Sequence, residues 1–86
     1  MNDSATAAVS FEGSLLQAPV RTPLTVRRAD GSPEFRRRLA ALGVRRGARV
    51  HVVHRTTGGG RIVSVAGARI ALGRDVLERI HVGQAG

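Results

Sequence analysis

The most informative local pattern in the chain is SPEFRRRLAALGV, residues 32–44. Ser32 is suited to the N-cap of a helix because its hydroxyl can accept a hydrogen bond from a free backbone N–H. Pro33 is suited to the first helical position, where its missing N–H costs nothing. Gly43 is suited to the position just beyond the helix, which commonly takes a positive φ. The stretch therefore predicts a short, capped helix.

The same stretch also indicates which side of the helix is buried. Phe35, Leu39 and Leu42 stand at i, i+4 and i+7 and so form one apolar stripe. Val44 can then close over Leu39, as the residue after the glycine does in a Schellman cap. We expect Leu39 and Leu42 mainly to maintain the fold.

Alternating apolar and polar residues predict short strands on both sides of this helix. Leu24 and Val26 alternate with polar residues before it, and Val50 and Val52 do the same after it. The dipeptide at 66–67, Ala-Gly, predicts a tight hairpin turn, because glycine readily takes a positive φ. The other predicted elements are strands at 48–54, 61–66, 68–72 and 80–82 and a single helical turn at 74–78.

The resulting order, β-α-β-β-β-turn-β, predicts a mainly β fold. Five short strands with one helix after the first are too few for a sandwich, and they suit a small, highly curved barrel that also protects strand edges. We place this barrel domain at residues 21–83. Residues 1–20 are rich in small and polar residues, so we expect a flexible arm. Within it, Phe11, Leu15 and Leu16 could pack as a short strand or turn.

Positive charge dominates the composition. The chain of 86 residues has 14 arginines, no lysine and 6 acidic residues, which gives a formal net charge of +8. Such a charge favours an acidic partner, whether nucleic acid, an anionic membrane surface or an acidic protein patch. An arginine-only basic set with abundant Ala, Gly and Val is also typical of a GC-rich coding sequence, so both explanations stay open.

Missing residue types narrow the possible functions. The chain has no cysteine, which excludes disulfides and thiolate chemistry and is compatible with a reducing compartment. Its only aromatic residues are two phenylalanines, which leaves no platform on which bases could stack. The sequence shows neither a basic-then-apolar leader nor a run of about 18–20 apolar residues. We expect a cytoplasmic location and no membrane span.

No catalytic or metal-binding constellation stands out in the sequence. His51 and His54 are the only close histidine pair, but i,i+3 residues of a strand point to opposite faces, and no acid or cysteine lies beside them. The glycines at 58–60 lack the Lys-Ser/Thr and the following helix of a phosphate-binding loop, so we interpret them as a hairpin loop. The sequence predicts no enzyme activity, no cofactor and no metal site.

Arginines gather around the predicted helix and the turn that follows it. Arg36 and Arg37 are predicted to face solvent. They form either a simple solvated helix face or one positive ridge together with Arg45, Arg46 and Arg49. Arginine makes bidentate contacts with carboxylates and phosphates, so such a ridge would suit an acidic protein surface or a nucleotide-binding domain.

Three segments stand in an order that carries a family resemblance. They are RLAALGVRRGARV at residues 38–50, VAGARIAL at 65–72 and IHV at 80–82. In this order and spacing they resemble the helix-to-strand segment, the hairpin strands and the closing strand of the ferrous-iron-transport protein A (FeoA) family. The likeness covers about residues 22–82.

The resemblance implies an SH3-like β-barrel of about five strands with one short α-helix inserted after the first strand. It also implies a non-enzymatic, cytosolic accessory of ferrous iron uptake that binds and modulates the GTPase-bearing membrane transporter FeoB. Related domains end metal-dependent repressors of the diphtheria-toxin-regulator type. An SH3 domain that binds proline-rich peptides is excluded, because its groove is lined by aromatic residues and this chain has no Tyr or Trp.

We therefore expect a binding module that docks through the helix, the turn after it and the loop at residues 55–61. The alternative is a small basic barrel that binds nucleic acid through phosphate contacts, and weak self-association stays open. A small Gly43 and an exposed Val44 would let a partner's backbone approach the end of the helix. The candidate partner-binding residues are Arg36, Arg37, Leu39, Leu42, Gly43, Val44, Arg45, Arg46, Arg49, Arg55 and Arg61.

Overall fold

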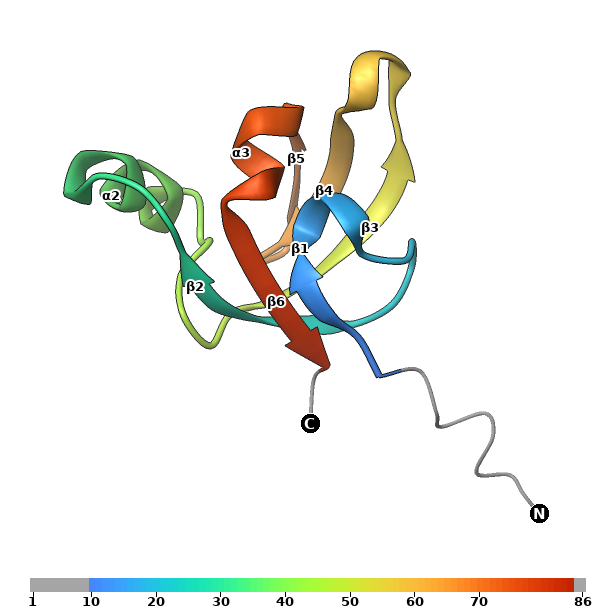
Figure 1. Ribbon diagram of the computed structural model, residues 1–86, viewed down its shortest axis with the longest axis horizontal. Helices are drawn as coiled ribbons and strands as arrows, with labels where there is room; N and C mark the ends of the chain where they lie inside the picture. The colour runs from blue at the N-terminus through green and yellow to red at the C-terminus, as the bar shows by residue number, and fades with distance from the viewer. Residues whose placement is uncertain (1–9, 85–86) are drawn as a thin grey trace.

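A computed structural model describes residues 10–84 of the chain, and it shows one curled antiparallel sheet accompanied by short helical segments (Figure 1). The fold is mainly β, as predicted. The strands are β1 (Glu12–Ser14), β2 (Leu24–Ala29), β3 (Arg49–Arg55), β4 (Arg61–Val65), β5 (Ala68–Leu72) and β6 (Ile80–Gln84). The helical segments are η1 (Leu15–Gln17), α2 (Pro33–Ala41), η2 (Thr57–Gly59) and α3 (Arg74–Glu78).

The strands follow the order β1-β6-β2-β3-β4-β5, so β1 and β5 form the two edges of the sheet. Register shifts interrupt the ladders between Val26 and Arg28 in β2 and between Val52 and His54 in β3. Such bulges bend a strand and increase its local twist, which lets a small sheet curl around its own core. An isolated parallel bridge joins Val20 to Val52.

The helix α2 has the predicted caps. The hydroxyl of Ser32 accepts a hydrogen bond from the backbone N–H of Phe35 at 3.1 Å, and Pro33 occupies the first turn. At the other end, the N–H of Val44 donates to the carbonyl of Leu39 at 2.9 Å, which is the long bond of a Schellman cap. The capped helix predicted from the sequence is confirmed.

The predicted apolar stripe is wrong at its last member. Leu42 is 47% exposed, whereas Val44 is only 2% exposed. The reason lies in the cap: the chain turns at Gly43, where φ is +96°, and Val44 then takes the inner position that the helical spacing assigned to Leu42. Phe35 is half-buried, and the guanidinium of Arg79 lies 5.3 Å from the centre of its ring.

The core is entirely apolar over the described residues, where no polar or charged residue is classed as buried. Each of three helical segments contributes one leucine to it: Leu15 from η1, Leu39 from α2 and Leu77 from α3. The strands contribute mostly valines, in the alternation that the sequence predicted. The core residues are Leu15, Ala18, Leu24, Val26, Leu39, Val44, Val50, Val52, Val63, Val65, Leu72, Leu77, Ile80 and Val82.

The beginning of the domain differs from the prediction. Residues 12–18 do not belong to an arm: β1 pairs with β6, Leu15 is fully buried and Ala18 is 1% exposed. The sheet therefore has six strands rather than five, and the helix follows the second strand. The three residues of β1, Glu-Gly-Ser, carry no apolar alternation, so only the pairing with the end of the chain makes them a strand. Residues 1–9 of the predicted arm lie outside the described residues.

The remaining elements follow the predicted spans closely, although β6 extends to Gln84. The turn between β4 and β5 has positive φ at both central residues, 52° at Ala66 and 80° at Gly67, as a type I′ hairpin requires. None of the helices in residues 10–84 is long and apolar enough to cross a membrane.

Candidate functional site

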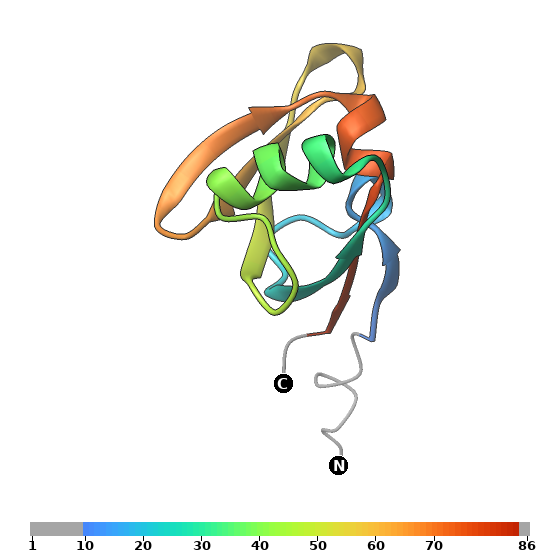
Figure 2. The ribbon, with the colours of Figure 1, turned by 90° about the vertical axis from the view of Figure 1, so that its left-hand side faces the viewer.

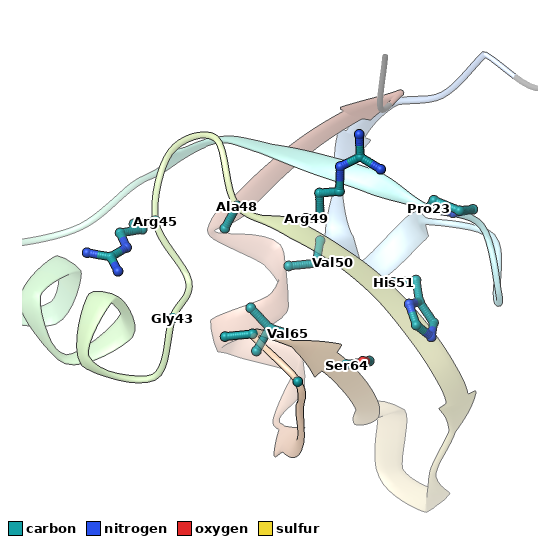
Figure 3. A pocket seen from close by; sticks show the side chains of 11 residues that line it. Pro23, Gly43, Arg45, Ala48, Arg49, Val50, His51, Ser64 and Val65 are labelled. Carbon is teal, nitrogen blue, oxygen red and sulfur yellow. The ribbon is translucent and has the colours of Figure 1, made fainter.

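A groove with a volume of about 600 Å³ lies between the turn after α2, the first residues of β3 and the β4–β5 hairpin (Figure 3). We call it the hairpin groove. Its lining mixes apolar side chains with basic ones. The lining residues are Pro23, Gly43, Arg45, Ala48, Arg49, Val50, His51, Ser64, Val65, Ala66 and Gly67.

A close approach between the helix end and the hairpin closes one side of this groove. A Cβ built on Gly43 would lie 2.9 Å from the Cβ of Ala66, nearer than side chains normally approach one another. Figure 2 shows the C-terminal end of α2 beside the turn of the β4–β5 hairpin. The absence of a side chain at Gly43 thus sets the distance between the two walls.

The arginines of the turn project from a backbone that is tied to the sheet. The N–H of Gly47 donates to the carbonyl of Val26, and the N–H of Val26 donates to the carbonyl of Ala48, both at 2.8 Å. Arg45 and Arg46 are exposed on this turn, and neither forms an ion pair with the acidic residues of the described chain. Rigid backbone anchors with unpaired guanidinium groups are suited to binding an external anion.

A second, smaller groove lies on the other side of the same turn and has a volume of about 340 Å³. We call it the arginine groove. Arg45 lines both grooves, so the turn forms the wall between them. The residues that line the arginine groove are Arg27, Arg28, Ala29, Arg36, Ala40, Val44, Arg45 and Arg46.

Two of these arginines form ion pairs with nearby acidic residues. The Nη2 atom of Arg27 donates to Glu12 Oε2 at 3.2 Å. The Nε atom of Arg28 donates to Asp30 Oδ1 at 3.1 Å, and His81 Nε2 lies 2.9 Å from Asp30 Oδ2. The hydrogen bond from Arg28 is the main cause that lowers the pKa of Asp30 below its ordinary value of 3.8.

The structure separates the predicted partner-binding residues into three sets. Leu39 and Val44 are buried in the core, so the prediction of an exposed Val44 is wrong and neither side chain can face a partner. Arg61 turns inward, where its Nη1 donates to the carbonyls of Gly59 and Gly60 at 2.9 and 2.8 Å. The residues that stay accessible are Arg36, Arg37, Leu42, Gly43, Arg45, Arg46, Arg49 and Arg55.

Most of the accessible arginines divide between the two grooves, which share Arg45. Arg45 and Arg49 line the hairpin groove together with Gly43. Arg36 and Arg46 line the arginine groove, while Arg37 and Arg55 line neither. The sequence reasoning missed Arg27 and Arg28, because β2 reaches the turn after α2 only through the tertiary fold.

His51 and His54 do not pair with any acidic residue of the described chain. His51 is half-buried on the wall of the hairpin groove, and His54 is exposed at the end of β3. Residues 10–84 contain no group of three or more His, Cys, Asp or Glu side chains that could hold a metal ion. The glycines at 58–60 belong to the β3–β4 connection, where the N–H of Thr56 donates to the carbonyl of Gly60 at 3.0 Å.

Comparison with known proteins gives one consistent result. A family model described as the FeoA domain matches residues 13–83. A crystal structure described as an iron uptake regulatory protein (FeoA) is 26% identical and covers 85% of this chain and 97% of its own, with a TM-score of 0.77. The solution structure of the FeoA protein from Chlorobium tepidum is 27% identical and covers 85% of this chain and 70% of its own, with a TM-score of 0.76.

Two further structures extend this likeness. A FeoA from Stenotrophomonas maltophilia, described as a prokaryotic SH3 domain protein complexed with zinc, is 28% identical over 80% of this chain and 87% of its own, with a TM-score of 0.67. A manganese-dependent transcriptional repressor shares the fold at 24% identity, and this chain spans 42% of it. No curated protein sequence matches significantly. The family model covers all six strands apart from the first residue of β1 and the last of β6, and the chain belongs to the FeoA family.

Proposed function

We propose that this protein is a non-enzymatic accessory of ferrous iron uptake that docks, through the hairpin groove, onto the cytosolic part of a FeoB-type membrane GTPase. Family membership supports the connection with iron uptake. The Stenotrophomonas maltophilia relative is described as possibly acting as a bacterial ferrous iron transport activating factor. In this proposal the protein acts in the cytoplasm and biases the GTPase or its assembly, and it contributes no chemistry of its own.

The observation that carries the docking surface is the composition of the hairpin groove. Arg45 and Arg49 line it together with apolar surface from Pro23, Ala48 and Ala66, because Val50 and Val65 are almost fully buried. Leu42, 47% exposed, directly precedes the lining residue Gly43. An apolar centre with a charged rim is typical of protein–protein interfaces, in which rim charges mainly steer the encounter.

The test is a calorimetric titration against the purified cytosolic domain of the transporter. Arg49→Glu and Leu42→Asp are expected to weaken binding by roughly tenfold or more, because the first reverses a rim charge and the second places a charge on an exposed apolar contact. Arg74→Glu is the matched control, since Arg74 is exposed on α3 and lines neither groove. Absence of binding by the folded wild-type protein would rule the proposal out.

The net charge of +8 supports a second candidate function, nucleic-acid binding through phosphate contacts. Such binding would rest on counterion release and would therefore weaken steeply as salt rises. Filter binding of a short duplex at low and high salt separates the two functions. Tight, salt-sensitive capture that the uncharged change Leu42→Ser leaves unchanged would favour nucleic acid over the transporter.

A further inference from the structure

Apart from Arg45, which lines both grooves, the arginines of the arginine groove take no part in docking through the hairpin groove. Five arginines line the arginine groove, and they come from three segments of the chain: β2, α2 and the turn after α2. The half-buried Ala29 and Ala40 add a small apolar floor, whereas Val44 is almost fully buried. A volume of about 340 Å³ falls within the range of small-ligand sites.

The charges in this groove are only partly compensated. Arg27 is paired with Glu12, and Arg28 is paired with Asp30. Arg36, Arg45 and Arg46, the other three arginines that line it, form no ion pair with any acid of residues 10–84. The groove therefore presents about three uncompensated positive charges to a ligand.

Several of the arginine side chains are held in place. Arg36 Nη1 donates to the carbonyl of Gly31 at 2.6 Å, and Arg27 Nη2 also donates to the carbonyl of Gln84 at 3.2 Å. A guanidinium has five N–H donors, so each of these groups keeps donors for a ligand. Side chains that are already ordered lose less conformational entropy when a ligand binds, which favours affinity.

We propose that the arginine groove binds a small diphosphate, either free pyrophosphate or the diphosphate of a nucleotide. A terminal phosphate group carries a charge of about −1.5 to −2, and the phosphate joined to it in a diphosphate adds about one more, so the pair compensates about three arginines in little space. Carboxylates carry one charge each, so three would have to enter the same groove. A nucleic-acid backbone spaces its single charges along the strand, and the chain offers no aromatic platform for its bases.

The apolar floor explains why the groove is larger than the anion itself. The side chains of Ala29 and Ala40 offer van der Waals contact but no hydrogen bond. They can therefore accommodate the group attached to the diphosphate without selecting it. The groove therefore recognises the diphosphate anion, which free pyrophosphate and a nucleoside diphosphate have in common.

The experiment is a calorimetric titration of the full chain with four probes: inorganic pyrophosphate, a nucleoside diphosphate, orthophosphate and citrate. We expect pyrophosphate to bind more tightly than orthophosphate and citrate, although citrate carries a similar charge. If pyrophosphate and the nucleoside diphosphate bind with comparable affinity, the protein recognises the diphosphate alone. If the nucleoside diphosphate binds more tightly, the natural ligand is a nucleotide. Either result supports the proposal.

Substitutions in the arginine groove test whether it is the pyrophosphate-binding site. The double change Arg36→Ala with Arg46→Ala is expected to weaken pyrophosphate binding by about tenfold or more, because two charge-assisted contacts are lost. Arg69→Ala, exposed on β5 and outside both grooves, is the matched control and should bind as wild type. Circular dichroism checks that the double variant is folded. If it is unfolded, the single variants Arg36→Ala and Arg46→Ala are titrated instead.

Three outcomes would overturn the proposal. They are citrate binding as tightly as pyrophosphate, an equal loss in the Arg69→Ala control, and no pyrophosphate binding at millimolar concentration by the folded protein. Neither Arg36 nor Arg46 lines the hairpin groove, so failure here leaves docking onto the transporter standing.

Discussion

The guanidinium of Arg61 donates a hydrogen bond from Nη2 to the backbone carbonyl of Leu16, 3.2 Å away and 45 residues earlier in the chain. Its other terminal nitrogen, Nη1, donates to the carbonyls of Gly59 and Gly60. One side chain at the start of β4 is thus hydrogen-bonded to both the β3–β4 connection and η1. An arginine that the sequence suggested for partner binding instead fastens the N-terminal segment to the sheet.

We predict that Arg61→Met lowers the free energy of unfolding by about 1–3 kcal/mol, because partly buried carbonyls lose their donors while the apolar part of the side chain is kept. Urea unfolding measures the loss. Arg55→Met is the control: Arg55 faces Arg61 across the β3–β4 ladder, is exposed, and should change stability by no more than about 0.5 kcal/mol. Equal effects in the two variants would contradict the role assigned to Arg61.

The helix and most strands could be predicted from the sequence because their signals are local. The cap residue Ser32, the glycine at 43 and the alternating valines of β3 each act on neighbours within a few positions. The strand β1 could not be predicted, because its ladder joins Glu12 to Gly83 at the other end of the chain. Its structure comes from tertiary pairing, which single-sequence periodicity does not report.

The candidate site was predictable only in part for the same reason. Arg36, Arg45 and Arg46 stand close together in sequence, and the prediction of accessible arginines there is consistent with the structure. Their division between two grooves depends on where β2 and the β4–β5 hairpin meet the turn, which no local pattern specifies. Burial of Val44 and exposure of Leu42 likewise follow from the turn at Gly43 rather than from helical spacing.

We predict that Gly43→Ala destabilises the protein more than Gly47→Ala does. Both glycines have positive φ, +96° and +88°, so both substitutions strain the backbone by about 1–2 kcal/mol, partly offset by a less flexible unfolded chain. Only at Gly43 would the new Cβ also meet the side chain of Ala66, at 2.9 Å, whereas Gly47 faces open space. Chemical unfolding should show an extra loss of about 1 kcal/mol or more at Gly43.

Equal losses at the two positions would show that the β4–β5 hairpin moves away without cost. In that case the wall of the hairpin groove is not fixed by Gly43. Transporter binding by the Gly43→Ala variant then provides a second measurement, because a displaced Ala66 changes the shape of the groove.

We predict that Ala66→Asn stabilises the protein by about 0.5–1 kcal/mol. Ala66 has a φ of 52° in a type I′ turn, and asparagine tolerates this left-handed conformation better than alanine does. Thermal and urea unfolding measure the gain. The control is Ala68→Asn, two residues later in β5, where an extended backbone gives asparagine no advantage and stability should fall. A loss of stability at position 66 would contradict the conformational argument.

The contacts of Asp30 lead to a prediction about pH. Its pKa is lowered chiefly by the hydrogen bond from Arg28; burial opposes this as the second-largest effect, and the charge of Arg28 and His81 lower the pKa further. A carboxyl group whose pKa is lower in the folded state stabilises the fold fully above its unfolded pKa. That contribution is lost as the pH falls through 3.8 toward the lower folded value.

We therefore expect Asp30→Asn to be less stable than wild type near pH 7 and to approach it as the pH falls below 3.8, because protonation removes the same interaction from the wild type. Urea unfolding across this range measures the convergence. Glu78→Gln is the control, since Glu78 forms no ion pair with any basic side chain between residues 10 and 84. The difference in stability between this variant and wild type should change less with pH. A constant offset between Asp30→Asn and wild type at every pH would show that Arg28 and His81 do not stabilise the ionised carboxylate in the folded protein.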